Sequence, residues 1–376
     1  MPVRYIRVNP LSELFAPAVR AFGNIGIVGT LTPPAASPPA NMLTVATPVL
    51  FTDPTDAQTR APGNLGTSIA LAFAQSPGPT VVYGVRVDET TPDWAAALAA
   101  LGSVSVQIVC LALTELDATT GAANGAIQAL ADHVTSVSTT GADGMERIGV
   151  AMLTKGSTDP TIVAGGLATE RMVYVAHKSG EDVAAAVAGA IAGYQPQISM
   201  LLKQVAVDTD QFTPAEIDQI NGVETFGSGP AGAGVNWLVS PALIPGRGVY
   251  LGEGYTGNPG GGKKYIDVVR TIDSVSFLLK AQLISSIGNI RISRSGLRAL
   301  IGQMESVLDP LVSQEVIEDY DIVVPLLPLL DMPAASLTAS QQAQITAAHS
   351  QRVVEVMVAV DYAGAIHRLD ITLKFE

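Results

Sequence analysis

The last ten residues of the chain, His367–Glu376, carry a strict alternation of apolar and polar positions. Apolar side chains stand at Leu369, Ile371, Leu373 and Phe375, and polar ones stand at Arg368, Asp370, Thr372, Lys374 and Glu376. A period of two predicts a β-strand with one apolar face. The preceding segment Val353–Asp361 has a similar pattern and predicts a second strand. Because chain ends fray unless something holds them, we expect the final strand to be paired, either within this chain or with a neighbouring copy.

Short apolar runs alternate with stretches of helical composition between residues 25 and 192. The runs predict strands over Ile25–Leu31, Thr47–Phe51, Thr80–Val87, Ser105–Ala112, Arg147–Leu153 and Arg171–Ala176. Helices are expected over Leu65–Ala74, Trp94–Leu101, Ala122–Val137 and Glu181–Ala192. Continuous apolar strands separated by helices predict a mostly parallel sheet covered on both faces. The fold class is therefore α/β.

A different composition begins after the glycine-rich stretch Gly254–Gly262, where we expect a domain boundary. Apolar residues spaced by three or four predict a long helix over Tyr265–Ile287. We further expect a helix over Ser295–Leu308 that Pro310 ends, a strand over Tyr320–Leu327, a helix over Thr338–His349 and the closing hairpin. The predicted organisation is an extended arm over 1–22, an α/β domain over 23–254 and an α+β domain over 255–376 that the arm joins.

Composition narrows the class of protein. Hydrophobic residues make up 48% of the 376 positions and charged ones only 15%, which predicts a folded chain that also buries apolar surface between subunits. The net charge of -13 disfavours binding to nucleic acid or to an anionic membrane. Cys110 is alone within an apolar run, so we expect a buried, inert thiol. The sequence shows no signal-peptide core and no apolar run of transmembrane length, and we expect a soluble cytoplasmic protein.

No constellation in the sequence singles out a catalytic or cofactor site. The glycines of Gly23–Gly29 are spaced three apart inside a predicted strand, which favours a bent strand or a close backbone approach over a dinucleotide fingerprint. The turn at Asn258–Gly262 and the following lysines lack the hydroxyl residue of a phosphate-binding loop. The four histidines are scattered without metal-ligand spacing. The acidic run Glu315–Asp321 indicates a solvated face or a docking site for a basic partner. We expect no cofactor and no metal.

Taken in order, five segments resemble the contractile tail-sheath family of bacteriophages, R-type pyocins and related contractile injection systems. The family's N-terminal arm and Val/Gly-rich first strand are matched by Val8–Leu31, its capped element by Gln211–Gly222, its G-x-N by Gly234–Asn236, its glycine turn by Gly248–Thr256, and its amphipathic helix by Tyr265–Asn289. The helix departs from the family pattern at Thr271, where a second basic residue is usual, and at its end, which reads SSIGN.

The resemblance implies a structural subunit, not an enzyme, with an outer α/β domain and an inner domain formed by the arm and the C-terminal third. Such subunits stack in helical or six-fold ring layers around an inner tube and contract to drive the tube through a target envelope. The implied partners are further copies of the chain, the inner tube protein, and baseplate and terminal cap proteins. The particle, a phage tail or tail-like particle, would be assembled in a bacterial or archaeal host cytoplasm.

The family also implies that terminal arms add strands to sheets of neighbouring subunits, which agrees with the patterned segments at both ends. The expected inter-subunit positions are Val3, Tyr5, Ile6, Val8, Leu369, Ile371, Leu373 and Phe375. A contact with the inner tube is expected near Lys263, Lys264 and Arg270. Two other hypotheses stay open at this stage: a homo-oligomeric α/β enzyme that binds a small ligand at the carboxyl ends of its strands, and a non-contractile shell protein.

Overall fold

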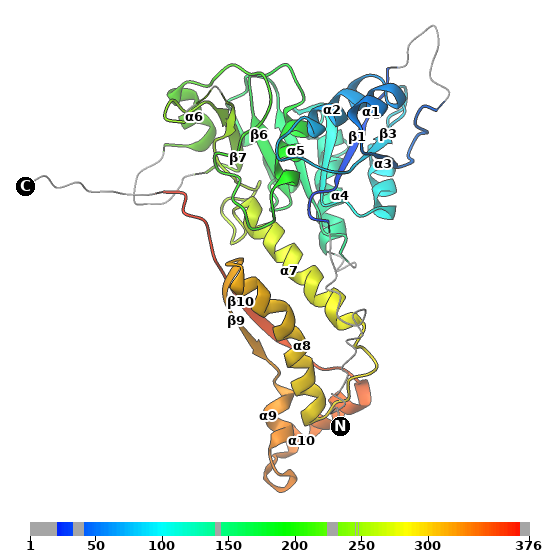
Figure 1. Ribbon diagram of the computed structural model, residues 1–376, viewed down its shortest axis with the longest axis vertical. Helices are drawn as coiled ribbons and strands as arrows, with labels where there is room; N and C mark the ends of the chain where they lie inside the picture. The colour runs from blue at the N-terminus through cyan, green and yellow to red at the C-terminus, as the bar shows by residue number, and fades with distance from the viewer. Residues whose placement is uncertain are drawn as a thin grey trace, which may run out of the picture. The chain divides into compact units, whose positions relative to one another are not determined.

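The structure, a computed structural model, describes residues 21–32, 41–139, 144–223, 232–244, 246 and 248–368 (Figure 1). Contacts divide the chain into two compact units. The first, here called the sheet unit, comprises Ala21–Asp273 together with the chain from Gly364 onward. The second, called the helical unit, comprises Ser274–Ala363. The predicted terminal strand positions, from Val3 to Val8 and from Leu369 to Phe375, lie outside the described residues.

The sheet unit is built on a mixed β-sheet with the order β2-β3-β1-β4-β5-β6-β7-β8. Its strands are β1 (Ile25–Gly29), β2 (Val49–Phe51), β3 (Val82–Arg86), β4 (Ile108–Leu116), β5 (Ile148–Leu153), β6 (Met172–Ala176), β7 (Val235–Val239) and β8 (Tyr250–Leu251). The six strands from β3 to β7 in that order are parallel, and the edge strands β2 and β8 are antiparallel to their neighbours. The prediction of a mostly parallel sheet is therefore confirmed. The last two strands were not predicted.

Helices cover both faces of this sheet. They are α1 (Pro54–Arg60), α2 (Asn64–Phe73), α3 (Trp94–Ala100), α4 (Ala126–Thr139), α5 (Val183–Gly193) and α6 (Pro214–Asn221). In β6, Val173 and Val175 join the core that contains α1, α2 and α5 residues, whereas Tyr174 and Ala176 join the core that contains α3, α4 and α6 residues. The strand is apolar throughout because each of its faces is buried against a helical layer.

Two details in and beside β1 and β4 agree with the sequence analysis. A Cβ atom at Gly29 would lie 2.5 Å from the Cβ of Ala112 on the neighbouring strand, and one at Gly23 would lie 2.1 Å from the carbonyl oxygen of Ala192. The glycines thus permit a close backbone approach, as expected. Cys110 is fully buried, and burial raises the pKa of its thiol well above the ordinary value. The prediction of a buried thiol is confirmed.

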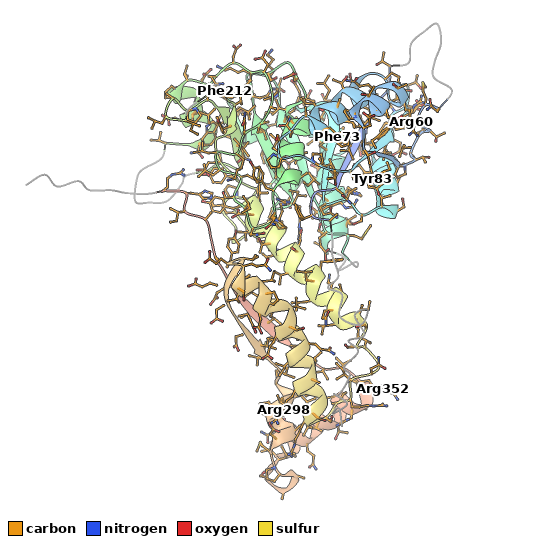
Figure 2. All side chains as sticks on the ribbon, in the orientation of Figure 1. Arg60, Phe73, Tyr83, Phe212, Arg298 and Arg352 are labelled. Carbon is orange, nitrogen blue, oxygen red and sulfur yellow. The ribbon has the colours of Figure 1, made fainter. Side chains whose placement is uncertain are left out.

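The helical unit contains two long helices and a small antiparallel sheet. Its elements are the second part of α7 (Ile266–Ile284), then α8 (Arg294–Ser313), β9 (Ile317–Val323), α9 (Leu326–Asp331), α10 (Ala339–Gln351) and β10 (Met357–Tyr362). The two strands pair with each other in an antiparallel register. The long helix and the strand predicted over Val353–Asp361 are confirmed by α7 and β10. Arg298, labelled on α8 in Figure 2, forms an exposed ion pair with Asp331 of α9.

Two boundary predictions in this unit were wrong. Pro310 does not end α8 but lies inside it, and the helix runs on to Ser313. The added turn places Leu311 and Val312 against a core formed by Val275 and Leu308, which favours continuing the helix. The strand predicted over Tyr320–Leu327 begins instead at Ile317, within the acidic run. The residues from Leu326 on are helical rather than extended.

The change of unit falls inside α7, between Asp273 and Ser274, whereas composition placed the domain boundary at residue 254. Ile266 and Val269 on the first turns belong to the core of the sheet unit. Val275 and Leu279 belong to a core of the helical unit. The glycine-rich stretch is therefore internal to the sheet unit, and the helix itself carries the chain from one unit to the other.

Candidate functional site

The carboxyl edge of the parallel strands is the usual ligand site of an open α/β sheet, and the enzyme hypothesis depends on it. In this chain β1 and β4 are neighbours in the sheet. The chain after β1 continues to β2 and β3 on one side, and the chain after β4 continues to β5 on the other, so a ligand crevice would open between β1 and β4. The register of β4 shifts between Cys110 and Glu115, and Leu113 has a φ of 45°. Its backbone N–H donates to Oδ2 of Asp182 at 2.7 Å. The irregular end of β4 therefore occupies this part of the edge.

Asp182 is the most deeply buried acid at that edge, and its bonds are internal to the fold. Oδ1 accepts from the N–H of Ala185 at 3.0 Å and so caps α5. Oδ2 accepts from the hydroxyl of Ser68 as well as from Leu113. Burial raises the pKa of the Asp182 carboxyl, and these hydrogen bonds oppose the rise. Both oxygens accept hydrogen bonds from within the fold, and only 2% of Asp182 is exposed, so this carboxylate serves the structure.

Two of the four histidines, His177 and His133, make polar contacts inside the sheet unit. Nε2 of His177 lies 2.9 Å from the carbonyl oxygen of Leu153, and burial lowers the pKa of this histidine. Nε2 of His133 lies 3.2 Å from Nη1 of Arg147, a fully buried side chain. Across the described ranges, no group of three His, Cys, Asp or Glu side chains is placed to hold a metal ion.

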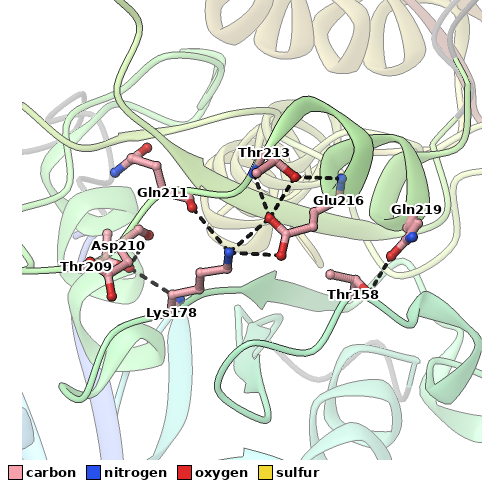
Figure 3. Close-up of polar contacts among 8 residues, drawn as sticks. All are labelled: Thr158, Lys178, Thr209, Asp210, Gln211, Thr213, Glu216 and Gln219. Carbon is pink, nitrogen blue, oxygen red and sulfur yellow. Dashed lines mark hydrogen bonds and ion pairs between the residues drawn. The ribbon is translucent and has the colours of Figure 1, made fainter.

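A polar network fixes α6 to the carboxyl end of β6 (Figure 3). Thr213 caps the helix, and Oε2 of Glu216 accepts from the backbone N–H of Thr213 at 2.7 Å, which completes a capping box. Nζ of Lys178, which follows β6, donates to both carboxylate oxygens of Glu216 at 2.9 Å. The same ammonium lies 4.9 Å from the ring centroid of Phe212, beside α6 (Figure 2). The predicted capped helix is confirmed, and its acid has a second role as the partner of Lys178.

The two lysines predicted to contact the tube lie at the end of a closed loop. Thr256 donates its backbone N–H to Lys264 at 2.8 Å and its hydroxyl to the carbonyl of Lys263 at 2.9 Å. The rings of Tyr255 and Tyr265 stack with centroids 5.7 Å apart. Nζ of Lys264 lies 5.1 Å and 5.7 Å from those two centroids. The side chain of Lys263 is 40% exposed, and its Nζ lies 3.7 Å from Oε1 of Glu170.

Arg270, the third predicted tube contact, is buried in the sheet unit with 6% of its surface exposed. Its Nη2 donates to the carbonyl oxygens of Phe22 at 3.2 Å and Tyr194 at 2.9 Å. Desolvation lowers the pKa of its guanidinium to about 10, although Asp267 and Asp273 act in the opposite direction. Arg270 thus holds the backbone at Phe22, where the described chain begins, and its charge faces the interior of its own unit.

A comparable contact holds the chain at its other end. The carboxylate of Glu253, only 1% exposed, lies 2.6 Å from Nη2 of Arg368 through Oε1 and 3.2 Å from Nδ1 of His367 through Oε2. Nε2 of His367 lies 2.8 Å from Oγ of Ser199, and its ring meets that of Tyr265 edge-on with centroids 4.7 Å apart. These contacts, here called the Glu253 anchor, fix the two residues that precede Leu369.

No protein-family model matches the chain, and no curated protein sequence does either. Solved structures do. The helical sheath of the anti-feeding prophage in its contracted state matches with a TM-score of 0.65 and 15% identity, over 100% of this chain and 98% of the other. The sheath of an extracellular contractile injection system, PVC, in its contracted state gives 0.65 and 12% over the same shares. The sheath tail protein Lin1278 from Listeria innocua gives 0.56 and 10%, over 82% of this chain and 90% of the other.

The chain has the fold of contractile sheath proteins. The likeness extends over the full length of the two contracted-state sheaths, so both units of this chain, and not the α/β sheet alone, have counterparts in the sheath fold. The expectation drawn from the order of the five sequence segments is confirmed at the level of fold. None of these structures favours the enzyme hypothesis.

The sequence predicts Arg270 as a tube contact, whereas the structure places its guanidinium inside the sheet unit, and the sequence pattern does not single out Glu253 or Ser199. Glu253 stands alone among glycines in the run LGEGYT, and its partner His367 is separated from it by 114 positions. A single acid in an otherwise apolar, glycine-rich segment was the only available signal. No local periodicity connects it with the end of the chain.

Proposed function

We propose that this protein is the structural subunit of a contractile tail sheath, which polymerises around an inner tube and contracts to drive the tube through a target envelope. The observation that carries the proposal is the full-length likeness to two sheaths in their contracted state. The pattern of sequence segments supports the same function independently of that likeness. The protein acts through assembly, with no catalytic step and no cofactor.

Strand addition by the terminal arms supplies the links between subunits. The inter-subunit strands run through Val3, Tyr5, Ile6 and Val8 at one end and through Leu369, Ile371, Leu373 and Phe375 at the other. The small sheet of the helical unit supports this assignment. Among the described residues, β9 and β10 pair only with each other, which leaves the outer edge of each strand available. An isolated two-stranded sheet is marginally stable, so added strands from neighbouring copies would complete it.

The inner tube contacts the sheet unit at Lys263 and Lys264. Lys263 keeps 40% of its side chain exposed, which suits it to an acidic partner surface. Arg270 acts behind these lysines by holding the backbone at Phe22. Baseplate and terminal cap proteins bind the two ends of the polymer, a role consistent with the likeness to the anti-feeding prophage baseplate structure, at a TM-score of 0.63 and 13% identity. The particle is assembled in the host cytoplasm as part of a phage tail or tail-like particle.

Deletion of Leu369–Glu376 tests the arm mechanism. The truncated chain is expected to remain a folded monomer, because the buried cores of the sheet unit are built from residues between Ile25 and Val269. It is also expected not to polymerise under conditions in which the full chain does, as measured by sedimentation velocity. Normal polymerisation of the truncated chain would show that the arm makes no inter-subunit link.

Charge reversal tests the tube contact. Lys263→Glu combined with Lys264→Glu is expected to abolish co-assembly with the inner tube protein and to leave polymerisation of the sheath protein alone unchanged. Lys155→Glu, at an exposed position outside this loop, is the matched control. Undiminished binding of the tube protein by the double variant would remove these lysines from the interface.

A further inference from the structure

Glu253 is a buried carboxylate whose polar partners Arg368 and His367 come from the root of the C-terminal arm. A buried charge is tolerated only when it is paired and hydrogen-bonded. Here the charged partner is Arg368, at 2.6 Å, and His367 is the second contact, at 3.2 Å. Their neighbour in sequence, Ile366, is 80% exposed, whereas the side chain of His367 is only 9% exposed, so the segment is held through His367 and Arg368. The need of Glu253 for a counter-charge therefore binds the root of the arm to the sheet unit.

The course of the chain shows what this contact decides. The strand β10 ends at Tyr362 in the helical unit, and the chain re-enters the sheet unit at Gly364. Six residues, 363–368, connect β10 with the arm, and the Glu253 anchor holds the last two of them. A free tether of that length spans up to roughly 20 Å. Each strand residue advances only about 3.3 Å, so such slack would allow several alternative registers.

The register matters because apolar and polar residues alternate strictly along the arm. A slip of one residue would turn Leu369 and Ile371 from the apolar face of an acceptor sheet to its polar face. With the Glu253 anchor closed, Leu369 follows directly after a fixed residue, and the tether has no slack. The anchor also makes the arm move with the sheet unit instead of with β10.

We infer that Glu253 is a positioning residue that sets the point and the register at which the C-terminal arm leaves the subunit to pair with a second copy of the chain. The role of the arm in this inference rests on the proposed sheath function. The anchoring contact itself does not, because it lies within one chain. The two claims can therefore be tested separately.

A spin label on Ile366→Cys reports the anchor in the unassembled protein, and Cys110 does not compete for the label because it is fully buried. The label is expected to move slowly in the otherwise unchanged chain and rapidly after Glu253→Gln. Arg368→Gln is expected to have the same effect, whereas Arg368→Lys, which keeps the charge, should retain slow motion. Asp331→Asn, in an exposed ion pair of the helical unit, is the matched control and should leave the label unchanged.

The same variants without the label are then compared in polymerisation. Glu253→Gln is expected to raise the lowest protein concentration that gives polymer several-fold, while cooperative thermal unfolding of the monomer shows that the variant is still folded. Equal label motion with and without Glu253→Gln would overturn the anchor. Faster motion with an unchanged polymerisation threshold would overturn its positioning role. If the unchanged chain forms no polymer while the label responds as expected, the sheath function fails and the anchoring contact stands.

Discussion

Arg171 and Asp273 form an ion pair of 2.6 Å in which the two side chains are 9% and 11% exposed. Arg171 directly precedes β6, and Asp273 is the last residue of α7 that belongs to the sheet unit. The pair therefore fastens the helix to the sheet at the point where the chain changes units. Because a buried pair is costly to break on one side only, this contact holds the first half of α7 to the sheet.

Removing one partner of this pair should destabilise the sheet unit strongly. Asp273→Ala leaves the guanidinium of Arg171 buried without its counter-charge, and the expected loss is about 3–5 kcal/mol in the free energy of unfolding. Urea denaturation of the unassembled protein measures it. Asp331→Ala, which removes an exposed partner of Arg298, should cost no more than about 1 kcal/mol. Equal losses from the two substitutions would show that the burial of the first pair has no energetic consequence.

Acid should loosen α6 through Glu216. The backbone N–H of Thr213, the ammonium of Lys178 and the hydroxyl of Thr213 lower the pKa of this carboxyl from 4.5 to about 2. Since the folded pKa lies below the unfolded one, the stabilisation is complete above the unfolded value and is lost as the pH falls toward about 2. Protection factors of amide hydrogen exchange over 212–221, which correct for the intrinsic rate at each pH, should fall in that window. In Glu216→Gln the protection factors should already be low at neutral pH and should change little further with acid.

His133 should make the stability of the folded protein depend on pH in a second, less acidic range. Desolvation, with a smaller contribution from the charge of Arg147, lowers the pKa of this histidine from 6.5 to about 4. The folded protein therefore keeps the imidazole neutral between those values, while the unfolded chain binds a proton. The contribution of neutral His133 to the free energy of unfolding is complete above about pH 6.5 and falls as the pH decreases toward about 4.

Thermal unfolding at several pH values checks this assignment. His133→Gln, whose amide oxygen can still accept from Arg147, should flatten the pH dependence between those limits. His349→Gln, at an exposed position of α10, is the control and should leave it unchanged. An unaltered slope in His133→Gln would assign the effect to another group.

Gly29 should not tolerate a side chain. A Cβ atom there would lie 2.5 Å from Cβ of Ala112, so Gly29→Ala is expected to force β1 and β4 apart and to cost about 1–3 kcal/mol. A Cβ atom at Gly102 meets nothing within 4 Å, and Gly102→Ala is expected to change stability by less than about 1 kcal/mol. Denaturation midpoints of the two variants provide the comparison. A neutral Gly29→Ala would contradict the close approach of the strands.

The sequence predicted the parallel core of the sheet unit because its strands are buried on both faces and read as unbroken apolar runs. It missed β7 and β8 because glycines surround them, and glycine density normally marks loops. The same bias placed the domain boundary at residue 254, although α7 continues the sheet unit to Asp273. The proline rule failed at Pro310 because packing of the following turn outweighed the lost hydrogen bond.

The candidate site was only partly predictable. Arg270 was found through the pattern of its helix, but its buried contact with the carbonyl of Phe22 depends on the fold. Glu253 and Arg368 come together only when a glycine turn meets a distant chain segment, and no spacing within the sequence records that meeting. The alternation over His367–Glu376 predicts a segment that pairs, but a pattern within one chain carries no information about which chain supplies the partner.

Electron microscopy of the purified protein, concentrated together with its inner tube protein, tests the central claim most directly. The account predicts long hollow cylinders of stacked rings or helical layers around a central tube, with the C-terminal strand of one subunit paired in the sheet of a neighbour. Small closed particles of intact protein at high concentration, with no cylinders at any ratio of the two proteins, would contradict it.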